Sequence, residues 1–227
     1  MKITYLGHSC LLIEGSKKKV IIDPFISENS NCSVNYKDIE VDAVLLTHAH
    51  ADHFGDSLHI AKQNDCPIFA VYELAAYCSS QGAKVVEMNV GGTFKEDGIF
   101  IRYTQAFHSS SLFVDGQFVY MGQPCGIVLE MDGKTLYHAG DTSLFSDMKM
   151  IGDLHPIDVA ALPIGDVYTM GPEDALIAAE WLHAKQVIPV HYNTFPPITQ
   201  DAGKFARDLK EKDITGLPLQ IGDVMQI

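Results

Sequence analysis

The chain has 227 residues, 47% of them hydrophobic, and its 16 lysines and arginines against 29 aspartates and glutamates give a formal net charge of −13. This length and composition predict one domain, residues 1–227, with a substantial core. The acidic surface argues against non-specific nucleic-acid binding, although divalent cations could still present an anionic substrate with a local positive charge.

The amino terminus, Met1 to His8, lacks the long apolar region and the cleavage site of a secretory signal. No apolar run reaches the roughly 18 residues of a membrane span. The 5 cysteines are odd in number and contain no Cys-x-x-Cys pair, which predicts reduced thiols rather than a disulfide framework. We therefore expect a cytoplasmic protein without membrane insertion, and a homo-oligomer is compatible with these features.

Apolar runs and alternating patterns predict mainly strands in the first part of the chain. The expected strands lie near 2–6, 10–14, 19–23, 41–46 and 68–71. Asp56 or Ser57 can cap a helix that ends near Cys66 and Pro67, and a second helix is expected near 72–81.

The middle of the chain is predicted to be mostly sheet, and alternation with helices returns in the last third. Strands are expected at 84–88, 99–106, 125–131, 134–138, 157–163 and 186–190, with helices at 173–183 and 199–212 and short strands at the end. Asp132-Gly133 is a hairpin signal. We interpret the aromatic residues near Phe118 and Tyr120 as a hairpin packed over the sheet. The pattern predicts an α/β fold, a four-layer sandwich of two mixed sheets flanked by helices.

Metal-ligand chemistry is concentrated in one short segment, which contains His48, His50, Asp52 and His53. Imidazole nitrogen and carboxylate oxygen suit zinc-like cations, and burying such groups without partners is costly. In an extended segment the two histidines of His-x-His share a side, whereas Asp52 and His53 can diverge toward a second point. These two directions predict two metal ions. Because the segment follows an apolar strand, the ions are expected at that strand's carboxyl end. A polar surface loop is the alternative.

Three further candidate ligands each follow a predicted strand: His108, Asp141 and His191. Alone, each could be a hydrogen-bonded loop residue, and Gly140-Asp141-Thr142 could be a turn that caps a helix. Together with the cluster they can supply two three-sided sites that share a carboxylate and keep an open position, as catalytic sites do.

The run from Thr47 to His53, with His108, Gly140-Asp141-Thr142 and His191, resembles the metallo-β-lactamase superfamily over most of the chain. Leu6-Gly7-His8-Ser9 and the segment from Tyr137 to Thr142 resemble its small metal-dependent hydrolases, a branch with ascorbate-6-phosphate lactonase-like and phospholipase D-like members. The resemblance implies the αβ/βα sandwich, the metallo-β-lactamase fold.

The same resemblance implies a ligand set. His48, His50 and His108 would hold one metal, Asp52, His53 and His191 the other, and Asp141 would bridge them. Asp141 stands where some true β-lactamases have a cysteine, which argues against antibiotic hydrolysis as the main role.

The expected chemistry is hydrolysis by a hydroxide that two divalent cations activate. Asp52 is the candidate catalytic carboxylate, which orients the nucleophile and accepts a proton. His8 and His138 are candidates for orienting the ligands from behind, with plain structural hydrogen bonding as the alternative. Zinc is preferred as the metal, while manganese, iron, cobalt and nickel also suit mixed nitrogen and oxygen ligands.

The leading hypothesis is a dinuclear metal hydrolase that acts on an ester, lactone or phosphodiester of a small-molecule substrate. A nuclease of the same superfamily is the first alternative, which the acidic charge disfavours. A non-catalytic metal-binding sensor is the second. Substrate-binding residues stay unassigned, and the loops near 24–38 and 109–123 are expected to select the substrate. His59, His155 and His183 are interpreted as structural.

Overall fold

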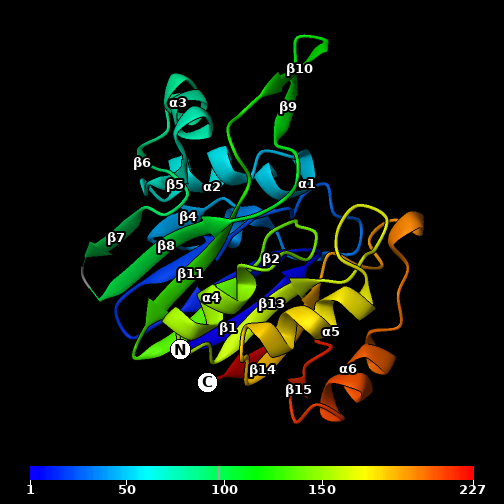
Figure 1. Cartoon of the computed structure of the whole chain (residues 1–227). Helices are drawn as coiled ribbons and strands as arrows, with labels where there is room; N and C mark the ends of the chain where they lie inside the picture. Colours follow the sequence, from blue (N-terminus) through cyan, green and yellow to red (C-terminus); the bar gives the residue numbers. More distant parts are fainter. Residues whose placement is uncertain (97) are drawn as a thin grey trace.

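The computed structural model describes residues 1–96 and 98–227, and it has two large mixed sheets packed face to face (Figure 1). The first sheet has 7 strands in the order β16-β1-β2-β3-β4-β5-β6, and the second has 7 in the order β15-β14-β13-β12-β11-β8-β7. The strands of the first sheet are β1 (Lys2–Gly7), β2 (Cys10–Glu14), β3 (Lys19–Ile22), β4 (Ala43–Leu45), β5 (Ile68–Val71), β6 (Val85–Met88) and β16 (Val224–Gln226).

The strands of the second sheet are β7 (Thr93–Glu96), β8 (Ile99–Gln105), β11 (Cys125–Met131), β12 (Lys134–His138), β13 (Val159–Pro163), β14 (Gln186–Val190) and β15 (Thr215–Gly216). On the outer face of the first sheet lie α1 (Ala51–Phe54), α2 (Ser57–Gln63) and α3 (Tyr72–Ser80). On that of the second lie α4 (Met148–Leu154), α5 (Pro172–Trp181) and α6 (Ala202–Lys210). This is the predicted four-layer αβ/βα sandwich. Two 3-10 turns, η1 (Tyr36–Asp38) and η2 (Pro196–Ile198), lie in the connections.

The apolar core follows from these layers. Ile21 and Val44 of the first sheet and Ile101 and Ile127 of the second are fully buried in one cluster. Tyr137 belongs to another cluster, together with buried residues of α5 and α6. Strands buried on both sides explain the continuous apolar runs that the sequence shows around 20–22 and 43–46. None of the helices in the described residues is long and apolar enough to cross a membrane.

Strand direction brings six chain segments to one edge of the sandwich. In the first sheet β1 and β3 both pair antiparallel with β2, and β4 runs parallel to β3. In the second, β8 and β12 both pair antiparallel with β11, and β13 and β14 run parallel to β12. The residues after β1, β3, β4, β8, β12 and β14 therefore all emerge at the carboxyl-end edge, where open α/β folds place their sites.

The sequence missed several short elements. The four-residue helix α1 starts inside the ligand cluster, and α4 and β7 were not predicted. Gly55 ends α1 with a φ of +39°, and its amide donates to the Ala51 carbonyl. A β-carbon at Gly55 would lie 2.3 Å from the Pro24 carbonyl oxygen, so this close approach requires glycine. Such a short helix depends on tertiary contacts and leaves little periodic signal.

The prediction that the aromatic hairpin packs over a sheet is wrong. Within the described residues, strands β9 (Ser111–Val114) and β10 (Gln117–Tyr120) pair with each other and with no other strand, and they project from the body (Figure 1). Their aromatic side chains Phe113, Phe118 and Tyr120 are 66%, 78% and 66% exposed. Alternation holds within the arm: Leu112 is 9% exposed and packs with Val114 and Val119 against the core cluster, whereas the opposite face, which carries the aromatic rings, is open to solvent.

Candidate metal centre

Three overlapping groups of potential metal ligands meet at the carboxyl-end edge in the described part of the chain, one of them Asp23 with His48 and His53. The first consists of His48, His50 and His108, whose nitrogen atoms lie within 4.8 Å of one another. His48 Nε2 and His50 Nδ1 are 3.1 Å apart, and the ring centroids of His50 and His108 are separated by 5.0 Å. Three imidazoles facing a common point form the three-sided nitrogen site of a catalytic metal.

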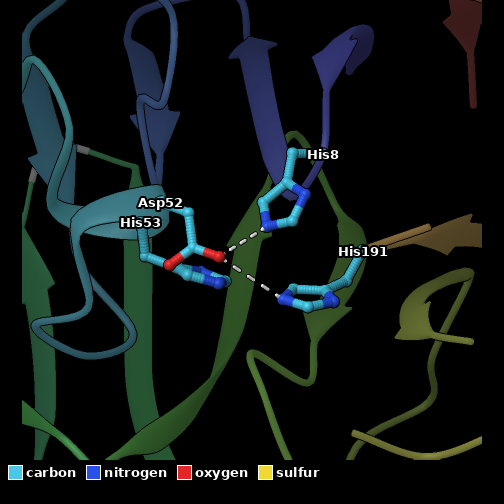
Figure 2. A group of neighbouring side chains, drawn as sticks. All are labelled: His8, Asp52, His53 and His191. Carbon is cyan, nitrogen blue, oxygen red and sulfur yellow. Dashed lines mark hydrogen bonds and ion pairs between the residues drawn. The ribbon is translucent and has the colours of Figure 1, made fainter. Parts of the chain in front are cut away.

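The second group consists of His8, Asp52, His53 and His191, drawn in Figure 2, and its ligand atoms also lie within 4.8 Å of one another. Asp52 Oδ2 is 3.0 Å from His8 Nε2 and 3.7 Å from His191 Nε2. His8 differs from the others because both of its ring nitrogens have partners, Nε2 with Asp52 and Nδ1 with Thr194 Oγ1 at 2.9 Å. A carboxylate only accepts, so His8 donates from Nε2 and holds Asp52 in place.

Asp141 lies between the two groups. Its Oδ2 is 3.0 Å from His191 Nε2, 3.5 Å from His108 Nε2 and 4.0 Å from His48 Nε2. Its Oδ1 is 3.3 Å from His53 Nε2. Gly140, with a φ of +62°, turns the chain here, and a β-carbon on it would meet the Cys125 carbonyl oxygen at 2.8 Å. One carboxylate thus faces imidazoles of both groups.

Asp23 is a functional residue that the sequence analysis missed. This fully buried carboxylate accepts hydrogen bonds from the Thr47 amide at 2.9 Å, Thr47 Oγ1 at 2.6 Å and His53 Nδ1 at 2.8 Å. Because the Thr47 hydroxyl donates its only proton to Asp23, it accepts from His48 Nδ1 at 3.0 Å. Asp23 therefore fixes the tautomer that both His53 and His48 adopt as neutral rings, in which Nε2 carries the lone pair that can bind a cation. Its position after strand β3, just before Pro24, is the same strand-end signal that identified His108 and His191.

The donor set fits metal ions. His53 Nε2 and Asp141 Oδ1 are both buried without a hydrogen-bond partner, and they face each other at 3.3 Å. Two lone-pair donors in this arrangement are stable only with positive charge near them. The buried carboxylates Asp23 and Asp141, with Asp52 beside them, add negative charge at the same place. Nitrogen and carboxylate oxygen ligands of this kind bind zinc-like divalent cations.

The pKa shifts describe the same electrostatics. Burial lowers the pKa of His48, and the neighbouring histidine His53 adds to this effect. For His191, burial acts in the lowering direction, but Asp141 and Asp52 outweigh it and raise the pKa to about 9. The facing histidines hold the pKa of Asp141 well below its usual range despite its burial. Asp141 and Asp52, whose pKa values are lowered, are ionised at neutral pH. The pKa values of His191 and His53 are raised, so cations bound there would displace protons from both rings.

Several backbone positions at the site are in the left-handed region. His8, Asp23 and His191 have φ values of 53°, 45° and 54°. Such conformations cost of order 1–3 kcal/mol each in non-glycine residues, and they persist where the surroundings over-determine them. The hydrogen bond from the His191 amide to the His8 carbonyl at 2.9 Å joins two of these turns across the sheets. Sheet-to-sheet contact thus sets the direction of these ligands.

The other histidines lie elsewhere. His138 donates from Nε2 to the Ser9 carbonyl at 2.9 Å and accepts at Nδ1 from the Gly140 amide at 3.1 Å. It braces the turn before Asp141, and both of its ring nitrogens are bonded to backbone atoms rather than to a candidate ligand. His59 lies beside Tyr36, His155 beside Glu130, and His183 beside Asp153.

Comparison with known proteins identifies the family. The family model described as "Beta-lactamase superfamily domain" matches residues 2–191. The chain belongs to the metallo-β-lactamase superfamily. The resemblance inferred from the ligand motif is thereby confirmed.

Within this superfamily the chain is similar to proteins named UPF0173 metal-dependent hydrolase. The one from Geobacillus thermodenitrificans is 52% identical over 228 residues, 100% of both chains. One from Thermus thermophilus is 47% identical over 227 residues, 100% of this chain and 99% of its own. Among solved structures, Igni18, a metallo hydrolase from the archaeon Ignicoccus hospitalis, is 37% identical with a TM-score of 0.90, covering 99% of this chain and 97% of its own. The chain is thus a metal-dependent hydrolase of the metallo-β-lactamase superfamily.

Proposed function

We propose that the protein is a dinuclear metal hydrolase that cleaves an ester, lactone or phosphodiester bond of a small molecule. The observation that carries this proposal is the position of Asp141, whose two oxygens face His53 on one side and His191, His108 and His48 on the other. A carboxylate shared between two three-ligand groups suits a pair of cations.

In this proposal His48, His50 and His108 would hold one cation, and Asp52, His53 and His191 would hold the other. Asp141 would be the ligand common to both. The chemistry that two such cations supply is Lewis acidity, which makes water a nucleophile at neutral pH and polarises the oxygen of the bond that breaks. Zinc is the proposed metal, because histidine nitrogen dominates the ligand set.

Asp52 is the proposed catalytic residue. Its Oδ2 is held by His8, while its side chain remains 27% exposed, so the carboxylate is fixed and still accessible to water. Asp52 orients the attacking water and accepts its proton. The water oxygen forms a bond to the acyl carbon or phosphorus, the bond to the leaving oxygen breaks, and the proton passes to that oxygen. The Thr194–His8–Asp52 chain of hydrogen bonds keeps this geometry.

We also propose that the protein works in the cytoplasm. Its cysteines are all free, with Cys10, Cys66, Cys78 and Cys125 buried. Unpaired thiols are typical of proteins in a reducing compartment.

The test is a screen of carboxylic esters, lactones and phosphodiesters with protein reconstituted separately with zinc and manganese. Asp52→Asn separates catalysis from a sensor role: the asparagine oxygen can still bind a cation but the amide cannot accept a proton, so we expect metal to be retained and turnover to be lost. Asp141→Ala should lose metal as well as activity. The proposal fails if metal-loaded protein hydrolyses no member of the panel, or if Asp141→Ala binds both metals normally.

A further inference from the structure

A pocket beside the candidate metal centre has an uncharged lining. It has a volume of about 620 Å³ and includes the ligand His108 and its neighbour Ser109. Ser109 Oγ lies 3.3 Å from His50 Nε2, so the pocket opens onto the first ligand group. None of its described lining residues is an aspartate, glutamate, lysine or arginine.

Two aromatic side chains provide flat apolar surface in this pocket. Phe107 is 56% exposed and packs edge-on against Phe145, with ring centroids 5.4 Å apart. Tyr120, at the end of β10, is 66% exposed and lines the pocket from the projecting arm. Exposed aromatic rings next to a reactive centre provide stacking surface for a planar apolar group.

Two amides provide the polar recognition. Gln123 Nε2 donates to Gln105 Oε1 at 2.9 Å, and Gln105 Nε2 donates to the Ala106 carbonyl at 3.1 Å. These bonds fix the orientation of both amides at the pocket wall and leave Gln123 Oε1 to accept from a ligand. A fixed, neutral amide pair suits an uncharged polar group and gives no compensation to an ionised one.

Two other cavities differ from this pocket because charged side chains line them. A cavity of about 700 Å³ is lined by Lys95, Lys134 and Lys185 together with acidic side chains. It lies where β12 and β14 begin, at the edge opposite the metal centre. A second charged cavity, with Asp166, Glu173 and Lys204 in its lining, lies beyond the carboxyl end of β13 and at the start of α5.

We infer that the 620 Å³ pocket, formed by Phe107, Tyr120, Gln105 and Gln123 beside His108, binds the uncharged, planar apolar part of the substrate. The substrate class is then a neutral aryl or similarly flat carboxylic ester or lactone, rather than a compound with an ionised group beside the scissile bond. This inference rests on the proposed hydrolase function and narrows it.

The test compares 4-acetoxybenzamide with 4-acetoxybenzoate, which have the same scissile acetyl ester and differ in a neutral amide against a carboxylate of nearly the same shape. With zinc-loaded protein, and after division by the rate of each ester with hydroxide alone, kcat/KM should favour the amide by about tenfold or more, because the pocket offers the carboxylate no partner. Equal rates, or a preference for the carboxylate, would overturn the inference while leaving the hydrolase function intact. If neither ester is cleaved but a phosphodiester is, the inference is likewise wrong. Cleavage of nothing in the wider panel refutes the proposed function itself.

Two variants localise the effect. Tyr120→Ala should raise KM for 4-acetoxybenzamide roughly two- to tenfold with little change in kcat. Phe113→Ala is the matched control, since Phe113 is on the same arm and equally exposed at 66%, but it is outside the pocket lining. Gln123→Lys should shift the preference toward 4-acetoxybenzoate. If Tyr120→Ala and Phe113→Ala behave alike and Gln123→Lys leaves the preference unchanged, the pocket does not hold the substrate.

Discussion

Replacing Asp23 by asparagine tests how the ligands acquire their orientation. Asp23 accepts from Thr47 and from His53 Nδ1, and through Thr47 it also controls His48. Asparagine has the same shape but replaces one acceptor oxygen with an NH₂ group. If that group faces His53, it donates to Nδ1 and moves the ring proton to Nε2, which blocks the nitrogen available to a cation.

The size of the effect follows from the two imidazoles involved. Loss of a residue that orients a ligand typically costs 10- to 100-fold in metal affinity or activity, or about 1.4–2.7 kcal/mol. Because one carboxylate serves a histidine of each ligand group, we expect Asp23→Asn to reach the upper part of this range and to weaken both sites. The overall fold should persist, since asparagine preserves the volume of the buried side chain.

The assay is competition with a chromophoric chelator, which measures zinc affinity for the wild-type protein and for the variant. Asp158→Asn is the control, because Asp158 is also buried and accepts from a backbone amide, that of Thr135, at the opposite edge of the second sheet. Circular dichroism and thermal unfolding verify that both variants are folded. A folded Asp23→Asn protein with wild-type affinity for both zinc ions would refute the reasoning.

Three further predictions address other parts of the structure. Gly140→Ala should abolish most metal binding, because the added β-carbon would lie 2.8 Å from the Cys125 carbonyl oxygen and 2.9 Å from Thr47 Cβ. Metal analysis of the purified variant measures this, and a normal metal content would contradict the close packing at Gly140. Burial acts to raise the pKa of Asp158, but hydrogen bonds from Lys185 and Thr135 outweigh burial and lower that pKa. The ionised Asp158 therefore stabilises the folded protein above the unfolded pKa of about 3.9, and this stabilisation is lost as the pH falls through the lower folded pKa. Denaturant titration should therefore show Asp158→Asn less stable by about 1–2 kcal/mol at pH 7 and the difference vanishing in acid, whereas a constant difference would disprove the ion-pair explanation. Phe205 lies on α6 and is buried in the second core cluster. Phe205→Ala should lower the free energy of unfolding by about 3–5 kcal/mol without changing the metal content per folded chain. A loss under about 1 kcal/mol would show that the core relaxes around the substitution.

The strong elements of the fold were predictable because their signals are local. Residues 20–22 of β3, 43–45 of β4 and 187–190 of β14 are apolar throughout. Asp132-Gly133 joins β11 to β12 with φ values of 53° and 71°. The Asp115-Gly116 turn between β9 and β10 carries the same signal, with φ values of 50° and 84°. The turn signal predicts that the two strands pair. It does not predict where the hairpin packs, because packing depends on residues far away in the chain.

In the candidate site, too, local signals were predictable and long-range contacts were not. The cluster around His48 and the strand-end positions of His108 and His191 were readable, because strand ends share an edge in this class of fold. Asp23 has the same placement after β3 but was missed, since an Asp-Pro pair at a strand end is also an ordinary turn. Its role depends on the contact with His53, 30 positions away, which only the folded chain displays.

Anomalous X-ray scattering at the zinc edge, from crystals of zinc-loaded protein, tests the dinuclear site most directly. The account predicts two peaks about 3.5–4 Å apart, each about 2.0–2.1 Å from histidine nitrogens. One peak should lie among His48, His50 and His108, the other among Asp52, His53 and His191, with an oxygen of Asp141 bound to both. A single peak in fully active protein, or two peaks that Asp141 does not touch, would contradict the account.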